Sequence, residues 1–240
     1  MFDKIFGAAS VALIAIGAVQ PSFAQSVAAD DCATGVHAII ARGQGPGNPN
    51  STLDVMVTLQ DLILAQIPGS TSLGLPFNYN EENKFDSVYN GAHLMQSYVT
   101  EYHKSCPQSK MAVVGYSLIY VQGAVVMTDA VCGTSSLLLS PVAPLDASYN
   151  KFVIAAIAYG DETFFPLQKW DKGNCTLGLG QFPRLDPAEC EPFADALQNY
   201  CDIGDSRCCG ILPLDGDAPH HTYMAKYNQD VVDFIKARLK

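Results

Sequence analysis

The sequence predicts an α/β fold in which helices cover both faces of a parallel β-sheet. Short apolar runs alternate along the chain with segments whose apolar residues recur at the 3.6-residue period of a helix. The short runs are apolar on both faces, as strands buried inside a parallel sheet are. This alternation, together with the lack of any repeat, linker or low-complexity tract, predicts a single domain.

The first 24 residues indicate a secretory signal peptide that is removed after Ala24. Lys4 lies in a short head, an apolar run covers residues 5–19, and small residues precede the cleavage point. The apolar run is too short to span a bilayer. Cleavage would leave residues 25–240, which is 240 − 24 = 216 residues, enough for one domain with a full core.

The charge balance argues against two classes of partner. The chain has 24 acidic and 14 basic residues, a net charge of −10, which disfavours nucleic acid and anionic membranes. Its eight cysteines are an even number in a chain predicted to be secreted, which favours disulfides over a metal site. No Cys-x-x-Cys pair suggests zinc. Asn50 and Asn174 begin glycosylation sequons, the second with Cys175 at its centre.

Three strands and two helices are expected in the first half of the chain. Each strand is a short apolar run, and each helix carries an apolar stripe that Pro or Gly helps to close. The strands are expected at 35–41, 75–79 and 111–115, and the helices at 51–67 and 87–105.

The second half has a less regular pattern. A helix is expected to end at Gly133, and a strand is expected at 151–159. Residues 166–187 show no sustained period and predict a long loop, while residues 193–201 are ambiguous between helix and strand. The last element, at 224–239, is predicted to be a helix with one apolar face and basic residues near its end.

Ser117 lies where the third expected strand turns into a helix. A nucleophilic serine occupies such a turn in the Gly-x-Ser-x-Gly elbow. Gly115 matches the first glycine of the elbow, but Ile119 stands in place of the second. Removal of residues 118–121 would leave Gly-Tyr-Ser-Gln-Gly-Ala, so the chain has the pattern of an elbow with four extra residues after the serine.

A serine nucleophile needs an imidazole to take its proton and a carboxylate to orient that imidazole, in the chain order Ser, Asp, His. Downstream of Ser117 the histidines are His220 and His221, just ahead of the last helix. Asp205 precedes them, between cysteines that could close a small ring around it. Either histidine could instead be a surface loop residue. The aspartates that could equally be turn formers on a solvated loop are Asp202, Asp205, Asp215 and Asp217.

Short motifs along nearly the whole predicted mature chain carry a resemblance to one family. They are His37-Ala38-Ile39-Ile40-Ala41-Arg42-Gly43, Cys106-Pro107 with Met111-Ala112-Val113-Val114-Gly115-Tyr116-Ser117, Gln122-Gly123-Ala124, Gly160-Asp161, Tyr200-Cys201-Asp202 with Asp205 and Cys208-Cys209, and Pro219-His220 with Tyr223. In these motifs the chain resembles the cutinase and acetylxylan esterase family of secreted serine esterases. The resemblance implies an α/β-hydrolase fold with a five-stranded parallel sheet and no large lid.

The resemblance also implies roles for individual residues. Ser117 would be the nucleophile, His220 the base, and Asp205 the acid that orients it. Main-chain amides of Gln44 and Leu118 would hold the oxyanion, although Gln44 lacks the hydroxyl that the family usually has there. The implied disulfides are Cys32–Cys106, Cys201–Cys208 and Cys175–Cys209, and Cys132–Cys190 then follows by elimination. No metal or other cofactor is implied, since this hydrolysis needs only water.

The four extra residues leave three interpretations open. As an added helical turn they would rotate the following helix by roughly 400° and shift it by about 6 Å, which keeps its buried face to within about 40°. Alternatively, they disturb the oxyanion geometry. In the third interpretation, they come from a misplaced splice junction and are absent from the protein.

The leading functional hypothesis is a secreted serine carboxylesterase that acts on a plant cell-wall polymer, removing acetyl groups from xylan. The eight cysteines, the Cys208-Cys209 pair and the Gly160-Asp161 turn look more like the acetylxylan esterase branch. The expected partner is therefore a polymer ester, either acetylated xylan or cutin, and the protein is expected to be a monomer.

Two alternatives follow from other residues. Leu212 and Leu214 could form an apolar rim before His220, which would suit a cutinase. Ile119 and Gln44 depart from the family pattern, which would suit a non-catalytic secreted protein that binds wall polymer or a host partner.

Overall fold

The structure is a computed structural model that describes residues 32–43, 53–77, 81–118, 121–210 and 218–240. The predicted signal peptide, the Asn50 sequon, Gln44, and the leucines and aspartates at 212, 214, 215 and 217 lie outside these ranges.

The described residues form a parallel sheet with strand order β2-β1-β3-β5-β7-β6. The strands are β1 Val36–Ala41, β2 Thr71–Gly74, β3 Lys110–Leu118, β5 Val153–Tyr159, β6 Asp171–Lys172 and β7 Leu197–Tyr200, with the short β4 Val121–Gln122 antiparallel to β3. The central strands are apolar on both faces and fully buried, as the pattern of the sequence predicted. The α/β class is thereby confirmed.

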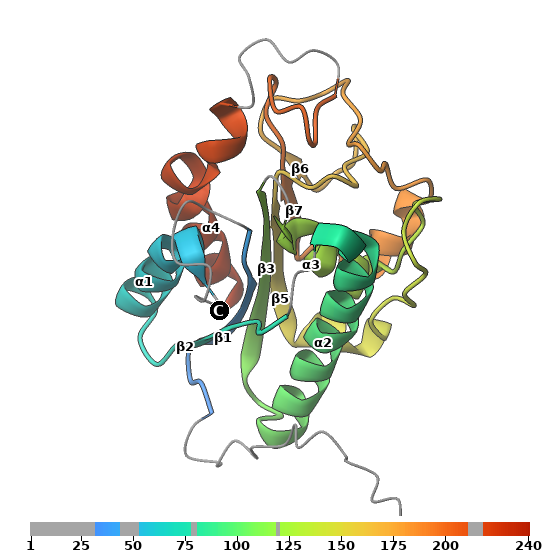
Figure 1. Cartoon of the computed structure of the whole chain (residues 1–240). Coiled ribbons are helices and arrows are strands. Elements are labelled where there is room, and N and C mark those ends of the chain that lie inside the picture. The colour runs from blue at the N-terminus through green and yellow to red at the C-terminus, as the bar shows by residue number, and fades with distance from the viewer. Residues whose placement is uncertain (1–31, 44–52, 78–80, 119–120, 211–217) are drawn as a thin grey trace, which may run out of the picture.

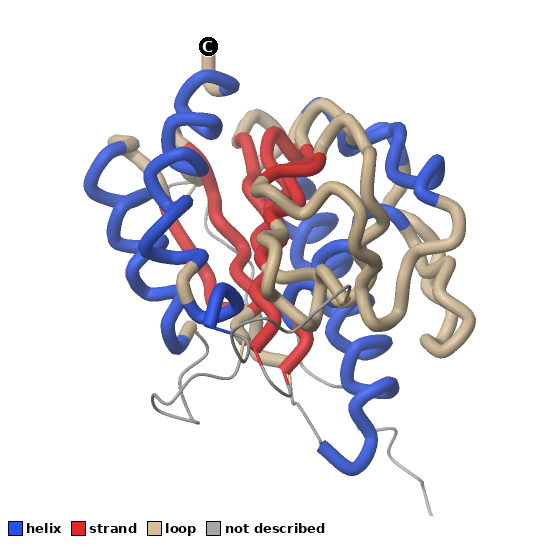
Figure 2. Tube along the Cα trace, turned by 90° about the horizontal axis from the view of Figure 1, so that it is seen from above, coloured by secondary structure: helices blue, strands red, loops and turns tan. Residues whose placement is uncertain are grey.

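Helices lie on both faces of the sheet (Figures 1 and 2). One face is covered by α1 Val57–Gln66 and α4 Tyr223–Arg238, and the other by α2 Lys84–Ser105 and α3 Gly123–Cys132. The 3-10 helices are η2 Asp54–Met56, η3 Glu81–Asn83, η4 Ala147–Lys151, η5 Pro187–Phe193 and η6 Ala218–His221. Each face buries its own apolar cluster, so the sheet is the middle layer of three.

Two strands differ from the sequence-based expectation. The strand expected at 75–79 is wrong in position, because β2 is Thr71–Gly74, a half-buried edge strand without the apolar run that marks the inner strands. A sixth parallel strand, β6, pairs with β7 inside the segment expected to be loop. Two residues are too short a strand to produce a detectable period. The ambiguous segment at 193–201 contains β7.

None of the helices in the described part of the chain is long and apolar enough to cross a bilayer.

Candidate active site

His220 and Asp205 form a buried hydrogen-bonded pair beyond the carboxyl end of the sheet. His220 lies in η6, just before α4, and Asp205 lies in the loop after β7. Nδ1 of His220 is 2.8 Å from Oδ2 of Asp205, and both side chains are at most 1% exposed. The other oxygen of Asp205 accepts the backbone N–H of Arg207 at 2.8 Å. The neighbouring His221 is exposed, so His220 is the histidine that the fold directs inward.

Disulfides fix the loop that carries Asp205. Cys201 and Cys208 are bonded across a separation of seven residues, and the Cys175–Cys209 bond ties the same loop to the segment before β7. The four sulfurs pack into one buried cluster with Phe164. Because the loop is closed covalently on both sides of Asp205, the carboxylate is held in place before any substrate binds. The remaining bonds are Cys32–Cys106 and Cys132–Cys190. Three of the four pairs are those that the resemblance implies, and Cys132–Cys190 is the pair that was reached by elimination.

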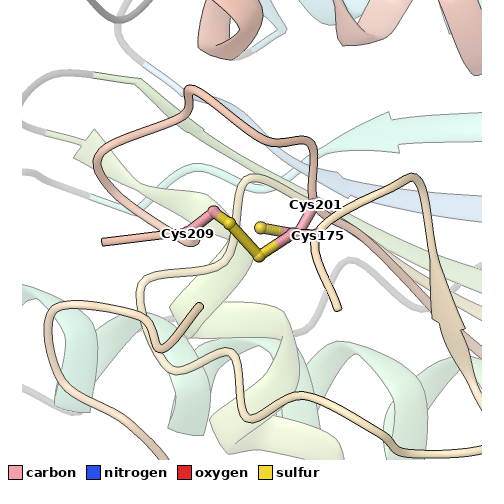
Figure 3. Close-up of side chains that lie close together, drawn as sticks. All are labelled: Cys175, Cys201 and Cys209. Atoms are coloured by element: carbon pink, nitrogen blue, oxygen red, sulfur yellow. A yellow bond between two sulfur atoms is a disulfide. The ribbon is translucent and has the colours of Figure 1, made fainter. Parts of the chain in front are cut away.

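Three of these sulfurs lie as close together as the ligands of a metal ion. One sulfur from each of Cys175, Cys201 and Cys209 lies within 4.8 Å of the other two (Figure 3). All three are disulfide-bonded, so this cluster has no thiolate to offer a metal ion.

Gly160 makes room for the pair at the end of β5. It has a φ of +63°, which L side chains rarely adopt. A Cβ there would lie 2.7 Å from Cε1 and 2.8 Å from Nδ1 of His220, and 3.2 Å from Oδ2 of Asp205. Only glycine therefore allows the imidazole to sit against the strand end. The motif Gly160-Asp161 is visible in the sequence, but its steric role depends on the fold.

Burial and hydrogen bonding act in opposite directions on the pKa of Asp205. Burial alone would raise the pKa of the carboxyl. The hydrogen bond and charge of His220, together with hydrogen bonds from Tyr223 and from the Arg207 amide, outweigh burial and hold the pKa below its usual value. Asp205 is therefore ionised at neutral pH, as an orienting carboxylate must be.

Tyr116 links β3 to the segment that carries His220. Its hydroxyl donates to the backbone oxygen of His220 at 2.8 Å, and its ring stacks near the imidazole with centroids 5.8 Å apart. Burial and the charge of Asp205 raise the pKa of Tyr116, so its hydroxyl stays protonated. Ser117 is the next residue along β3 and is 1% exposed.

Ser117 does not stand at a turn, which corrects the sequence-based expectation. β3 continues through Ser117 to Leu118, and β4 returns antiparallel to it, with Ser117 opposite Gln122 and Leu118 opposite Val121. β3 and β4 thus form a hairpin in which Leu118 and Val121, two of the four extra residues, are paired strand residues, and α3 gains no turn from them. The helix begins at Gly123, and all of its residues are buried. The rotation of about 400° expected for an added helical turn therefore does not occur.

Gly123 takes the place of the second elbow glycine. A Cβ at Gly123 would collide with the carbonyl oxygens of Ala41 and Arg42, at the end of β1, and would crowd that of Tyr116. A Cβ at Gly115 would collide with the carbonyl of Gly123. The close packing of β3 against the start of α3 is thus kept, although β4 lies between them in the chain. The Gln122-Gly123-Ala124 motif is the feature of the sequence that indicates this packing.

The predicted relay is half formed in this structure. Within the described residues Nε2 of His220 is buried and has no hydrogen-bond partner, so the bond to the Ser117 hydroxyl is not made. Of the predicted oxyanion residues, Gln44 lies outside the described ranges, and the main chain of Leu118 pairs with Val121. The roles of Ser117, Asp205, His220, Gln44 and Leu118 remain predictions.

Asp202, another carboxylate that the sequence offers near Asp205, has other partners. Its oxygens accept from Lys226 at 2.7 Å and from the hydroxyl of Tyr227 at 2.8 Å, both on α4. It fastens the helix to the loop and does not reach His220.

A parallel sheet between helices, with a serine at the end of its central strand and a buried His-Asp pair in the loops beyond, defines the α/β-hydrolase class of proteins. A family model for Cutinase matches residues 32–239. The chain belongs to the cutinase family.

Two relatives and one solved structure show the range of this family. The chain is 29% identical over 194 residues to an acetylxylan esterase of Hypocrea jecorina and 29% identical over 192 residues to Cutinase 11 of Verticillium dahliae, covering 76% of this chain in each case. It spans 61% and 62% of the length of these relatives. The catalytic core domain of acetyl xylan esterase from Trichoderma reesei matches with 26% identity and a TM-score of 0.67, over 85% of this chain and 98% of that core.

Proposed function

We propose that the protein is a secreted serine carboxylesterase that removes acyl groups, above all acetyl groups, from a plant cell-wall polymer. One observation carries the proposal: a fully buried Asp205–His220 pair whose Nε2 has no other partner among the described residues. A buried imidazole nitrogen without a hydrogen bond is costly, and it is typical of a group reserved for a substrate or a nucleophile. Similarity to acetylxylan esterases supports xylan acetate as the substrate.

In the proposed mechanism His220 is the general base. With Asp205 ionised, Nδ1 carries the proton that is donated to Oδ2, which leaves the lone pair of Nε2 free. Nε2 takes the proton of the Ser117 hydroxyl as its oxygen attacks the ester carbonyl. The imidazolium then gives the proton to the leaving alcohol, and water, activated by the same nitrogen, releases the acid from the acyl-enzyme.

The oxyanion would be stabilised at the junction of β1, β3 and α3. The main-chain amides proposed for this are those of Gln44 and Leu118. Leu118 follows Ser117 directly in β3, and Gln44 follows the end of the neighbouring β1 by three residues, so their amides would serve an oxyanion formed at Ser117.

The test uses p-nitrophenyl esters of increasing acyl length and acetylated xylan, with Ser117→Ala as the matched control. We expect hydrolysis that falls steeply from acetate to butyrate and beyond, release of acetic acid from the xylan, and loss of both activities in the control. Activity that survives in folded Ser117→Ala, or no activity of the folded wild-type protein on any ester, would overturn the proposal. The latter result would favour a non-catalytic wall or host binder.

A second candidate, hydrolysis of cutin, is favoured by an apolar groove next to the Asp205 loop. The groove has a volume of about 430 Å³ and is lined by Leu177, Leu179, Gly180, Gln181, Ser206 and Gly210. Leu177 and Leu179 are 75% and 43% exposed, so they could accept a fatty acyl chain. Maximal activity at butyrate or longer esters would select this candidate over the first.

A further inference from the structure

Besides the imidazole of His220, the hydroxyl of Tyr223 also contacts the carboxylate of Asp205. Tyr223, the first residue of α4, is fully buried, and its hydroxyl lies 2.7 Å from Oδ2 of Asp205. The same oxygen is 2.8 Å from Nδ1 of His220. Two donors, one from the imidazole and one from the phenol, therefore converge on one carboxylate oxygen.

The direction of the tyrosine proton follows from its other neighbours. The backbone N–H of Asp202 donates to the Tyr223 oxygen at 3.0 Å. Sγ of Cys208 is 3.4 Å from that oxygen and 3.2 Å from Oδ2 of Asp205, but a disulfide sulfur carries no proton. The only hydrogen of the phenol is thus left to point at Asp205. Burial and the charge of Asp205 raise the pKa of Tyr223 well above its usual value, so the proton stays on the phenol.

We propose that Tyr223 is a positioning residue of the catalytic pair, which takes up part of the negative charge of Asp205 and so limits how strongly the carboxylate attracts the imidazole proton. The proposal rests on the proposed role of His220 as general base. Tyr223 itself touches neither substrate nor reacting atoms, and it acts through Asp205.

Loss of the Tyr223 hydroxyl should affect Asp205 and His220 in the same direction, because each should bind a proton more readily. Without the phenol, the Asp205 carboxylate loses a hydrogen bond to its charged form and binds its own proton at higher pH. Its full charge also then faces His220 and favours the imidazolium. Both changes inactivate the base at a higher pH than before. A hydrogen bond to a charged group is large enough to move such a midpoint by about one pH unit.

Other groups around the pair define the background for this effect. On the side of β3, the hydroxyl of Tyr116 is directed at the backbone of His220. Among the described residues, other titratable or charged groups near the pair or its loop are Arg207 with its partner Glu162, Asp202 with its partner Lys226, the exposed His221, and the phenols of Tyr159 and Tyr227. Of these residues, Asp202 contacts the phenol oxygen of Tyr223, but through its backbone N–H, so its carboxylate and the other side chains keep their partners when that oxygen is removed.

The primary experiment compares Tyr223→Phe with Tyr227→Phe. Tyr227 lies one helical turn further along α4 and also gives its hydroxyl to a carboxylate, but to that of Asp202 at 2.8 Å. The acid limb of the pH profile of kcat/KM on p-nitrophenyl acetate should move to higher pH by about one unit in Tyr223→Phe, and it should stay in place in Tyr227→Phe. An unmoved limb in a folded, active Tyr223→Phe enzyme would overturn the proposal.

A readout without turnover separates this proposal from the proposed function. The ¹³C signal of the Asp205 carboxyl, assigned by its loss in Asp205→Asn, should titrate at a higher pH in Tyr223→Phe than in the wild-type protein. This result is expected even if Ser117 proves inactive and no ester is hydrolysed. Equal titration midpoints would refute the role of Tyr223, whatever the activity.

A second perturbation covers the case in which Tyr223→Phe does not fold. Replacement of Tyr223 by a fluorinated tyrosine keeps the hydroxyl and makes it a stronger donor. The Asp205 carboxyl should then titrate at lower pH than in the wild type, and the acid limb should move the same way. Shifts in the opposite direction, or none, would contradict the proposal.

Discussion

The two halves of the candidate site differ in how firmly they are built. The Asp205–His220 half is buried, closed by disulfides, packed against Gly160 and held by several hydrogen bonds to Asp205. The Ser117 half is a strand that continues into a hairpin where related enzymes of this class have a tight turn. The difference shows that covalent and steric constraints in its own loops fix the Asp205–His220 pair, whereas the position of Ser117 depends on the pairing of β3 with β4.

The hairpin leaves the surrounding fold almost untouched. Ser117 and Gln122 are already cross-strand partners, so their Cα atoms are about 4.5–5.5 Å apart. A trans peptide would need about 3.8 Å. Removal of the residues between them therefore requires only a small adjustment, and α3 can stay in place.

A substitution in the Asp205–His220 half should have the largest effect on activity. Gly160→Ala should lower kcat by about 100-fold, because the new Cβ displaces the imidazole by a large fraction of an ångström or more. The measurement is kcat on p-nitrophenyl acetate.

Gly133→Ala is the control for backbone strain, since Gly133 also has a positive φ, of +78°, at the far end of α3. It should lose stability but keep kcat. Equal loss of kcat in both variants would mean that strain, and not displacement of His220, explains the result.

Restoring the elbow sequence in the Ser117 half should have the next largest effect, an increase in activity. Deletion of residues 118–121 restores Gly-Tyr-Ser-Gln-Gly-Ala and puts the amide of Gln122 directly after the nucleophile. We expect kcat/KM to rise by at least about 10-fold, since one oxyanion donor contributes about 10²- to 10³-fold. A folded deletion variant with lower activity than the wild type would show instead that the hairpin serves the reaction.

The disulfides should separate stability from catalysis. Cys201→Ser with Cys208→Ser opens a short ring and should cost about 2–3 kcal/mol of unfolding free energy, together with a drop in kcat because Asp205 loses its fixed position. Chemical denaturation and ester kinetics on the same samples provide both values.

The matched pair is Cys32→Ser with Cys106→Ser, whose bond spans 74 residues at the opposite end of the sheet. Its loss should cost more stability, about 4–5 kcal/mol, but leave kcat unchanged. A larger fall in kcat for this pair would contradict the role given to the Asp205 ring.

The smallest effect concerns pH and stability. The pKa of Asp205 is lower in the folded protein than in the unfolded chain, so its contribution is fully present above the unfolded value of about 3.9 and is lost as the pH falls through the folded value. The difference in unfolding free energy between wild type and Asp205→Asn should therefore shrink below about pH 4. A difference that stays constant down to pH 2 would argue against an ionised Asp205 in the folded state.

Much of the fold, and the residues of the Asp205–His220 half, could be predicted from the sequence. The apolar runs marked the inner strands, and the order of Asp205 and His220 between cysteines and the last helix pointed to the buried pair. Gly160 and Tyr223 were noticed as parts of motifs, but their contacts arise only when β5, η6 and α4 meet in space.

The hairpin could not be placed by helical arithmetic. The four extra residues are Leu118, Ile119, Tyr120 and Val121, three of which have high strand propensity, and this signal in the sequence favours a strand over an added helical turn. The edge strands β2 and β6 escaped prediction for a different reason, because a polar or two-residue strand has no apolar pattern to detect.

The central claim is that His220 activates Ser117, and one labelling measurement tests it most directly. The folded protein is treated with a serine-directed alkyl phosphonate, and the adduct is located by peptide mass mapping in the wild type and in His220→Ala. We expect a single adduct on Ser117 in the wild type and none in His220→Ala. A wild-type protein that is folded but unlabelled, or one labelled equally well without His220, would contradict the account.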